Sequence, residues 1–118
     1  MAGRLTTHVL DTVSGKPAVG LEVTLWSLSP SGERTLLKTV LTNQDGRTDS
    51  PLIPDGELKQ GLYELVFSVG DYFREQTDLP DVPFLGDVPV RFGVDDERAH
   101  YHVPLLVSPW AYSTYRGS

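Results

Sequence analysis

The sequence contains no cysteine among its 118 residues, so the fold has no disulfide and the chemistry has no thiolate. It has no continuous apolar run of the roughly 18 residues needed to cross a bilayer, and its N-terminal segment lacks the apolar stretch of a signal peptide. Because no disulfide can form, the stability of the fold must come from packing. We expect a cytoplasmic protein that has no membrane partner.

Positive charge is also scarce, and it is not concentrated in any one segment. The chain has 10 basic against 16 acidic residues, a formal net charge of -6, and its Lys and Arg are scattered along the sequence. Because nucleic-acid binding depends on clustered cations, no nucleic-acid partner is expected. A glycine-rich phosphate loop and a metal-binding histidine pattern are both missing, so the sequence implies no cofactor and no metal.

What the sequence does have is a series of short runs in which apolar residues alternate with other residues. Side chains of a β-strand point alternately to its two faces, so such runs predict half-buried strands. The predicted strands cover residues 4–11, 21–26, 34–42, 50–54, 62–69, 88–94 and 100–107. Strands of this length, separated by turn residues, indicate an antiparallel β-sandwich. With 39% hydrophobic residues, the chain fits a single domain covering residues 1–118.

Three local features interrupt the strand pattern. Asp71 stands where its side chain would cap a helix that runs to about Gln76. Pro104 lies inside the predicted strand 100–107, and because proline cannot donate to a ladder, a bulge or an edge position is expected there. The residues from Asn43 to Gly46 are typical of an Asx turn, which would directly precede Arg47.

Two of the three histidines fall in the predicted strand 100–107. His100 and His102 share one face of this strand, while Tyr101 points to the other face, which we expect to pack in the core. On spacing alone, a solvated histidine pair and a catalytic pair are both open. Histidine is the side chain most easily poised as a base near neutral pH, which makes this face a candidate site.

Three short segments, in order along the chain, resemble those of a known family. They are Leu5 to Asp11 (LTTHVLD), Asp45 to Thr48 (DGRT) and the terminal Tyr115 to Ser118 (YRGS). Together they resemble the 5-hydroxyisourate hydrolases, the transthyretin-like enzymes of urate degradation. The resemblance implies an all-β, transthyretin-like sandwich of two four-stranded sheets with one short helix, assembled as a homotetramer from two dimers. The first strand and strand 100–107 would be neighbours in one sheet.

The same resemblance implies an activity and a set of residues. The reaction is hydrolysis of 5-hydroxyisourate to 2-oxo-4-hydroxy-4-carboxy-5-ureidoimidazoline in purine metabolism. His8 and His102 would activate water and relay its protons, and the guanidinium of Arg47 would stabilise the developing oxyanion. His100 would be structural or would support another residue. The residues implied to bind the substrate are His8, Arg47, Tyr115, Arg116 and Ser118.

Two other interpretations are open. One is a non-catalytic transthyretin-like carrier that binds a hydrophobic ligand in the channel between dimers, since Ser108 to Thr114 (SPWAYST) resembles both branches. Such carriers lack histidines at the positions of His8 and His102 and do not end in Tyr-Arg-Gly-Ser. The other is an adhesive or accessory β-sandwich, in which all three matching segments would be coincidental. The residues therefore favour the enzyme.

Overall fold

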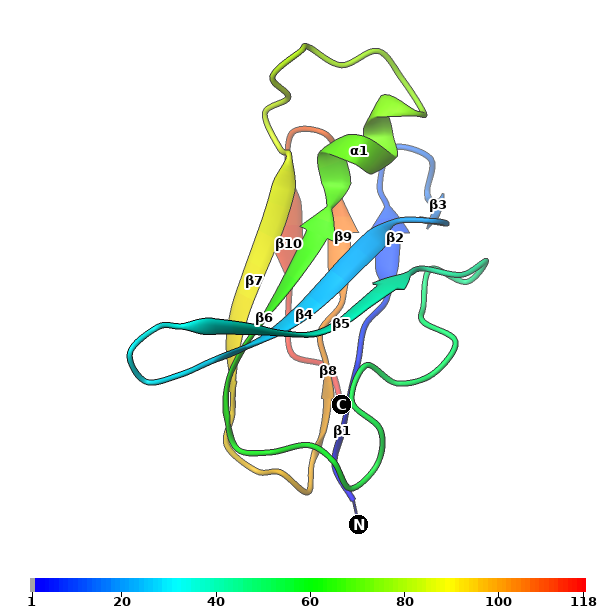
Figure 1. The fold of residues 1–118 in the computed structure, drawn as a ribbon. Coiled ribbons are helices and arrows are strands. Elements are labelled where there is room, and N and C mark those ends of the chain that lie inside the picture. Colours follow the sequence, from blue (N-terminus) through cyan, green and yellow to red (C-terminus); the bar gives the residue numbers. More distant parts are fainter. Residues whose placement is uncertain (1) are drawn as a thin grey trace.

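The computed structural model describes residues 2–118, whose strands form two facing layers with one short helix at one end (Figure 1). One layer is a four-stranded sheet in the order β5-β4-β6-β7, and the other contains a four-stranded sheet in the order β10-β9-β2-β3 together with the pair β1-β8. The elements are β1 (Arg4–Thr6), β2 (Val9–Asp11), β3 (Lys16–Pro17), β4 (Glu22–Leu28), β5 (Arg34–Leu41), β6 (Gly61–Ser68), α1 (Val69–Arg74), β7 (Asp87–Val94), β8 (His100–His102), β9 (Leu105–Val107) and β10 (Tyr112–Thr114). The predicted all-β sandwich with one short helix is confirmed.

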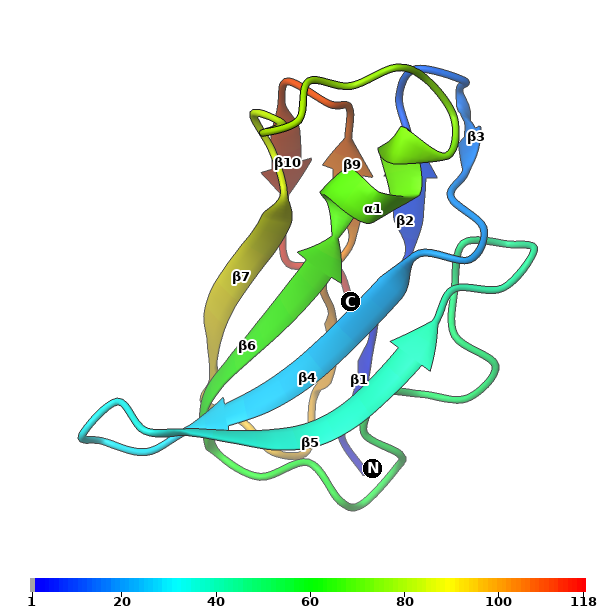
Figure 2. The same ribbon diagram turned by 45° about the horizontal axis from the view of Figure 1, so that its top comes forward.

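In the layer β5-β4-β6-β7 the four strands lie side by side in this order (Figure 2), and β4 and β7 follow the predicted alternation of buried and exposed residues. All of its pairs are antiparallel, with Val23 opposite Phe67 and Phe67 opposite Val88. These three side chains are buried against the other layer, while the intervening Glu22 and Arg91 are exposed. Burial of one side of β4, β6 and β7 therefore fixes the register among these three strands, whereas β5 at the edge has no buried residue.

The other layer differs from the prediction, because two predicted strands are each broken in the middle. Residues 4–11 form β1 and β2 with a break at Thr7 and His8, and residues 100–107 form β8 and β9 with a break at Val103 and Pro104. Across the break, the Thr7 hydroxyl donates to the Val103 carbonyl at 2.7 Å. The expected irregularity at Pro104 is thus an interruption in the interior of this layer.

The broken strands also pair in an unexpected direction. β1 pairs with β8 and β2 pairs with β9 in parallel, whereas the other strand pairs of the fold are antiparallel. Side-chain alternation predicts which face of a strand is buried but carries no information on the direction of its neighbour. The predicted neighbourhood of the first strand and the histidine strand is confirmed.

Two local predictions were wrong in detail. The helix begins at Val69, with Ser68 at the N-cap position, so Asp71 lies in the first turn and does not cap the helix. The helix starts earlier because Val69 and Phe73 are buried on its inner side. The carboxylate of Asp71 in the first turn still interacts favourably with the positive end of the helix dipole. Residues 50–54 form no strand, and only Ile53 makes a bridge, to Leu5.

The core lies between the two layers and takes its side chains from both. Leu5, Val9 and Leu105 from one layer and Leu65 and Phe67 from the other have no exposed surface. The strands β1 and β8, which carry the histidine face, are anchored in this core by their opposite face, through Leu5 and Tyr101.

Within residues 2–118, no helix is both long and apolar enough to cross a membrane.

Candidate active site

A pocket of about 510 Å³ opens on the outer face of the β1-β8 pair. It is bounded by that face, by the loop after Arg47 and by the end of the chain, which lies beside β1 and β8 in Figure 1. Its lining residues are Arg4, Thr6, Thr7, Arg47, Thr48, Asp49, Ser50, Pro51, His100, His102 and Ser118. A second pocket, of about 580 Å³, lies between β4, β6 and residues 52–60, but no histidine or arginine lines it. The first pocket is therefore the candidate site.

The β1-β8 register brings the histidines together with Thr6. Arg4 lies opposite His100 and Thr6 opposite His102, so the side chains of these four residues share the outer face. The Thr6 hydroxyl lies 2.7 Å from His100 Nε2 and 2.8 Å from His102 Nδ1. Both distances are those of hydrogen bonds, so the two imidazoles are held by one hydroxyl.

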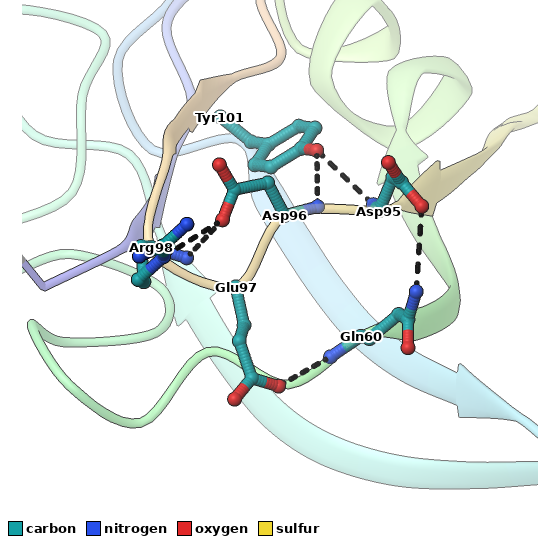
Figure 3. Close-up of polar contacts among 6 residues, drawn as sticks. All are labelled: Gln60, Asp95, Asp96, Glu97, Arg98 and Tyr101. Atoms are coloured by element: carbon teal, nitrogen blue, oxygen red, sulfur yellow. Dashed lines mark hydrogen bonds and ion pairs between the residues drawn. The ribbon is translucent and has the colours of Figure 1, made fainter.

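The residue between the two histidines fixes their strand from the other side. Tyr101 is buried, and its hydroxyl accepts hydrogen bonds from the backbone N–H groups of Asp95 and Asp96, each at 3.1 Å (Figure 3). The guanidinium of Arg116 lies 4.3 Å from the centre of the Tyr101 ring, on its face. β8 is thus held at its central residue, which limits the motion of the histidines on either side.

Arg47 is positioned by the predicted Asx turn, which the structure confirms. The side-chain carbonyl of Asn43 accepts from the backbone N–H groups of Asp45, at 2.9 Å, and Arg47, at 3.2 Å. Gly46 has a φ of 73°, and its carbonyl accepts from the Val9 N–H at 2.8 Å. A Cβ at Gly46 would lie 2.5 Å from the Val9 carbonyl oxygen, so only glycine lets this turn dock beside β2.

The last residues of the chain are also held at the histidine face. Gly117 N–H donates to the His102 carbonyl at 2.7 Å, and His102 N–H donates to the Gly117 carbonyl at 3.3 Å. A Cβ at Gly117 would lie 3.0 Å from His102 Cδ2. The φ of Gly117 is not positive, so glycine is needed here for close approach rather than for backbone freedom.

The structure gathers some of the predicted site residues and separates others. Arg47, His102 and Ser118 line one pocket. Tyr115 and Arg116 instead line a separate hollow of about 260 Å³ near Tyr101, and their predicted contacts with substrate stay a prediction. None of the four ion pairs among residues 2–118 involves Ser118.

Comparison with known proteins settles the family. The family model described as HIUase/Transthyretin family matches residues 5–117 of the chain. The chain belongs to this family. Among curated relatives, the 5-hydroxyisourate hydrolase of Mesorhizobium japonicum is 61% identical over 117 residues, which cover 98% of this chain and 93% of that protein. The HIUase/Transthyretin fold expected from the three short segments is therefore confirmed.

Solved structures of HIUase/Transthyretin proteins agree with this assignment. The crystal structure of (S)-allantoin synthase matches with a TM-score of 0.92 and 48% identity, covering 99% of this chain but only 44% of that longer chain. Sea bream transthyretin in complex with thyroxine matches with a TM-score of 0.86 and 27% identity, covering 97% of this chain and 94% of that one. The same fold thus occurs both in an enzyme and in a protein that binds thyroxine.

The electrostatics of the pocket in this HIUase/Transthyretin chain favour neutral imidazoles. Burial lowers the pKa of His102, and the positive charge of Arg47 and the neighbouring His100 and His8 lower it further. Burial and the charge of Arg4 lower the pKa of His100 as well. Because both pKa values are lowered from the usual value for histidine, the neutral form of each ring, the form required of a base, is favoured.

His8 lies at the break between β1 and β2, outside the lining of the pocket, but close enough to influence the pKa of His102. Its carbonyl accepts from the Leu105 N–H at 2.9 Å, which holds the break against β9. Its predicted catalytic role stays a prediction. Within residues 2–118, no group of three His, Cys, Asp or Glu side chains is arranged to hold a metal ion.

Two residues of the pocket were not recognised from the sequence, Thr6 and His100. The alternation of residues 4–11 places Thr6 on the same face as His8, but a threonine on a solvent-facing strand surface gives no signal of its own. His100 was assigned a structural or supporting role only. The contact that gives both of them significance joins residues 94 positions apart, and a single sequence does not reveal such a pairing.

Proposed function

We propose that this protein is a 5-hydroxyisourate hydrolase, which converts 5-hydroxyisourate to 2-oxo-4-hydroxy-4-carboxy-5-ureidoimidazoline. The observation that carries the proposal is the pocket that combines the Arg47 guanidinium with the His102 imidazole. The name of the Mesorhizobium japonicum relative, at 61% identity, supports the same activity. The cytoplasmic location and the single-domain extent expected from the sequence stay predictions.

The chemistry follows from the two groups in the pocket. Hydrolysis of a ring amide needs a water made nucleophilic and a carbonyl oxygen whose developing charge is stabilised. A neutral His102 accepts the proton of the attacking water, and His8 shares in activating the water and relaying its protons, the role that the family resemblance implied for both histidines. The guanidinium of Arg47 presents a planar set of N–H donors to the oxygens of a flat, urate-like ring.

A carrier function is the alternative that the thyroxine complex of sea bream transthyretin raises. A site for a hydrophobic ligand needs mostly apolar walls and few polar groups. The candidate pocket instead carries two arginines and two histidines among its lining residues. Its composition supports a polar, hydrogen-bonding substrate over a hydrophobic cargo.

The test of the proposed function is the ultraviolet decay of freshly made 5-hydroxyisourate. We expect the intact protein at micromolar concentration to accelerate the decay well above the spontaneous rate, with saturation at high substrate. Heat-inactivated protein is the control for trace metals and buffer effects. A decay rate unchanged by the native protein contradicts the proposed enzyme and leaves the carrier interpretation.

We also propose that the protein assembles as a homotetramer. The support comes from β10, which is an edge strand with exposed side chains, and from apolar residues left exposed near it. Trp110 is 63% exposed and Phe84 is 68% exposed, and their rings stack with centroids 6.0 Å apart. Unpaired strand edges and exposed aromatic pairs are features that assembly buries.

Light scattering coupled to size-exclusion chromatography tests the assembly. We expect a mass four times the 13.0 kDa of one chain at micromolar concentration. Phe84→Asp should lower this mass, because a charge would have to be buried in the interface. Leu36→Asp, which places the same charge on the exposed face of β5, is the matched control and should leave the mass unchanged. A stable monomer for the parent protein contradicts the proposal.

A further inference from the structure

The hydrogen bonds around Thr6 constrain the protonation of both histidines. Its hydroxyl lies 2.7 Å from His100 Nε2 and 2.8 Å from His102 Nδ1. A hydroxyl carries a single proton, so it donates to one of these nitrogens at most, and the other nitrogen must be the donor. The protonation of the two rings is therefore coupled through one side chain, although neither ring touches the other at a ring-centroid separation of 6.2 Å.

The two arrangements have opposite chemical consequences for His102. If Thr6 donates to His102 Nδ1, the neutral ring carries its proton on Nε2 and offers the pocket a donor. If Thr6 donates to His100 Nε2, His102 donates its Nδ1 proton to Thr6, and its Nε2 is left with a free lone pair. Only the second arrangement makes His102 a base toward a water in the pocket.

We propose that Thr6 and His100 are positioning residues that select the Nδ1-protonated tautomer of His102 and that take up its Nδ1 proton, by relay through the Thr6 hydroxyl, when Nε2 of His102 takes a proton from water. This inference rests on the proposed hydrolase function. It assigns a role to Thr6, for which the family resemblance gave none, and makes specific the structural or supporting role expected of His100. It also defines a chain of three groups in the order His102, Thr6, His100.

The proton balance closes over one turnover. In the first step the water oxygen bonds to the ring carbonyl carbon and the π electrons of the carbonyl move to its oxygen. The O–H bond of water breaks and an Nε2–H bond forms on His102, while the Nδ1 proton passes to Thr6 and the Thr6 proton passes to His100 Nε2. His100 is then the cation, and His102 is neutral with its proton on Nε2. When the ring C–N bond breaks, His102 gives that proton to the leaving nitrogen, and the chain runs backwards to restore the starting state.

The charges around the two rings support His100 as the place where the proton rests. His102 faces Arg47, His8 and His100, all of which lower its pKa in addition to burial. Burial and the charges of Arg4 and Arg116 lower the pKa of His100, whereas the negative charge of Asp55 raises it. The negative charge of Asp55 therefore offsets part of the cost of an imidazolium at His100.

The decisive experiment reads the tautomer directly, without reference to activity. In nitrogen-15 NMR of the intact protein at about pH 8, above the usual histidine pKa of ~6.5, two-bond couplings distinguish the two neutral tautomers. We expect the Nδ1-protonated form for His102 in the parent and a shift toward the Nε2-protonated form in Thr6→Val. An Nε2-protonated His102 in the parent overturns the inference even if the protein is a hydrolase.

Kinetics provide the second measurement, with a matched pair of variants. Thr6→Val removes the hydroxyl while keeping the branched shape, and we expect kcat to fall by about 10- to 100-fold with KM within about threefold, part of the usual contribution of a general base. Thr6→Ser keeps the hydroxyl and should restore kcat to within about threefold of the parent. Equal losses in the two variants would mean a packing role only and would overturn the inference.

His100→Gln covers the case in which Thr6→Val does not fold. It leaves Thr6 in place but removes the group that accepts the proton, so kcat should fall by about tenfold or more. Thermal unfolding of each variant confirms that it is folded at the assay temperature. Parent-like kcat in a folded His100→Gln protein excludes the proton-accepting role.

Discussion

Replacing His102 by alanine is expected to lower kcat for 5-hydroxyisourate hydrolysis by about 10²-fold or more while leaving the fold intact, because the substitution removes the general base. The side chain is half-buried on the outer face of β8, where Tyr101 and the backbone ladder hold the strand without it. Arg47→Ala should cause a loss of similar size, since it removes the oxyanion donor. Steady-state kinetics together with thermal unfolding measure both effects.

The same prediction has a pH component whose direction follows from the site. Burial and the charge of Arg47 lower the pKa of His102, so the ring stays neutral to more acidic pH than an ordinary histidine. The acid limb of the parent's kcat profile should therefore have its midpoint below ~6.5. The control is Thr35→Ala, on the exposed side of β5 in the other layer, which should match the parent at every pH.

For the alanine substitution itself, near-normal turnover in a folded His102→Ala protein contradicts the role of His102 as general base.

Deleting Tyr115 to Ser118 is expected to abolish most of the hydrolysis and to spare the fold. The tail pairs its backbone with His102 through Gly117, and Ser118 lines the pocket, so its loss opens the pocket and frees one side of β8. Its contribution to stability is small, because Tyr115 is 60% exposed and a cation–π contact such as that of Arg116 gives about 0.5–1 kcal/mol at an exposed site.

Steady-state kinetics and a melting curve separate these two effects of the deletion. The melting temperature should change by no more than about 5 °C. Gly117→Ala tests the same contact within the full-length chain, because its Cβ would lie 3.0 Å from His102 Cδ2 and must displace either the tail or the ring. A rate constant within about threefold of the parent's, less than 1 kcal/mol in barrier, would leave the tail without a catalytic part.

Alternation along the strands was enough to predict which faces are buried. It placed Tyr101 in the core and the two flanking histidines on the outer face, and the structure shows this arrangement. The prediction works because side chains alternate between the two faces of a strand wherever one face is buried. It did not predict the breaks at residues 7–8 and 103–104 or the parallel pairing of β1 with β8. These features depend on how distant segments meet, which side-chain polarity does not encode.

The start of the helix and the site residues show the same limit. Asp71 is a good capping residue by type, but burial of Val69 decided where the helix begins. The family resemblance singled out Arg47 and His102, which lie in one pocket, and also Arg116, which lies over Tyr101 away from that pocket. A motif identifies residues that matter in a family without stating which of them meet in one chain.

The parallel pairing of β1 with β8 has a consequence for how the protein forms. Thr6 and His102 are 96 positions apart, so β1 is synthesised long before its partner and waits unpaired while most of the chain is made. The strands of the antiparallel layer are closer together in sequence, and such contacts form faster because shorter loops must close. We therefore expect the histidine face to be among the last parts of the molecule to assemble. Recovered activity, rather than recovered strand content, reports that folding is complete.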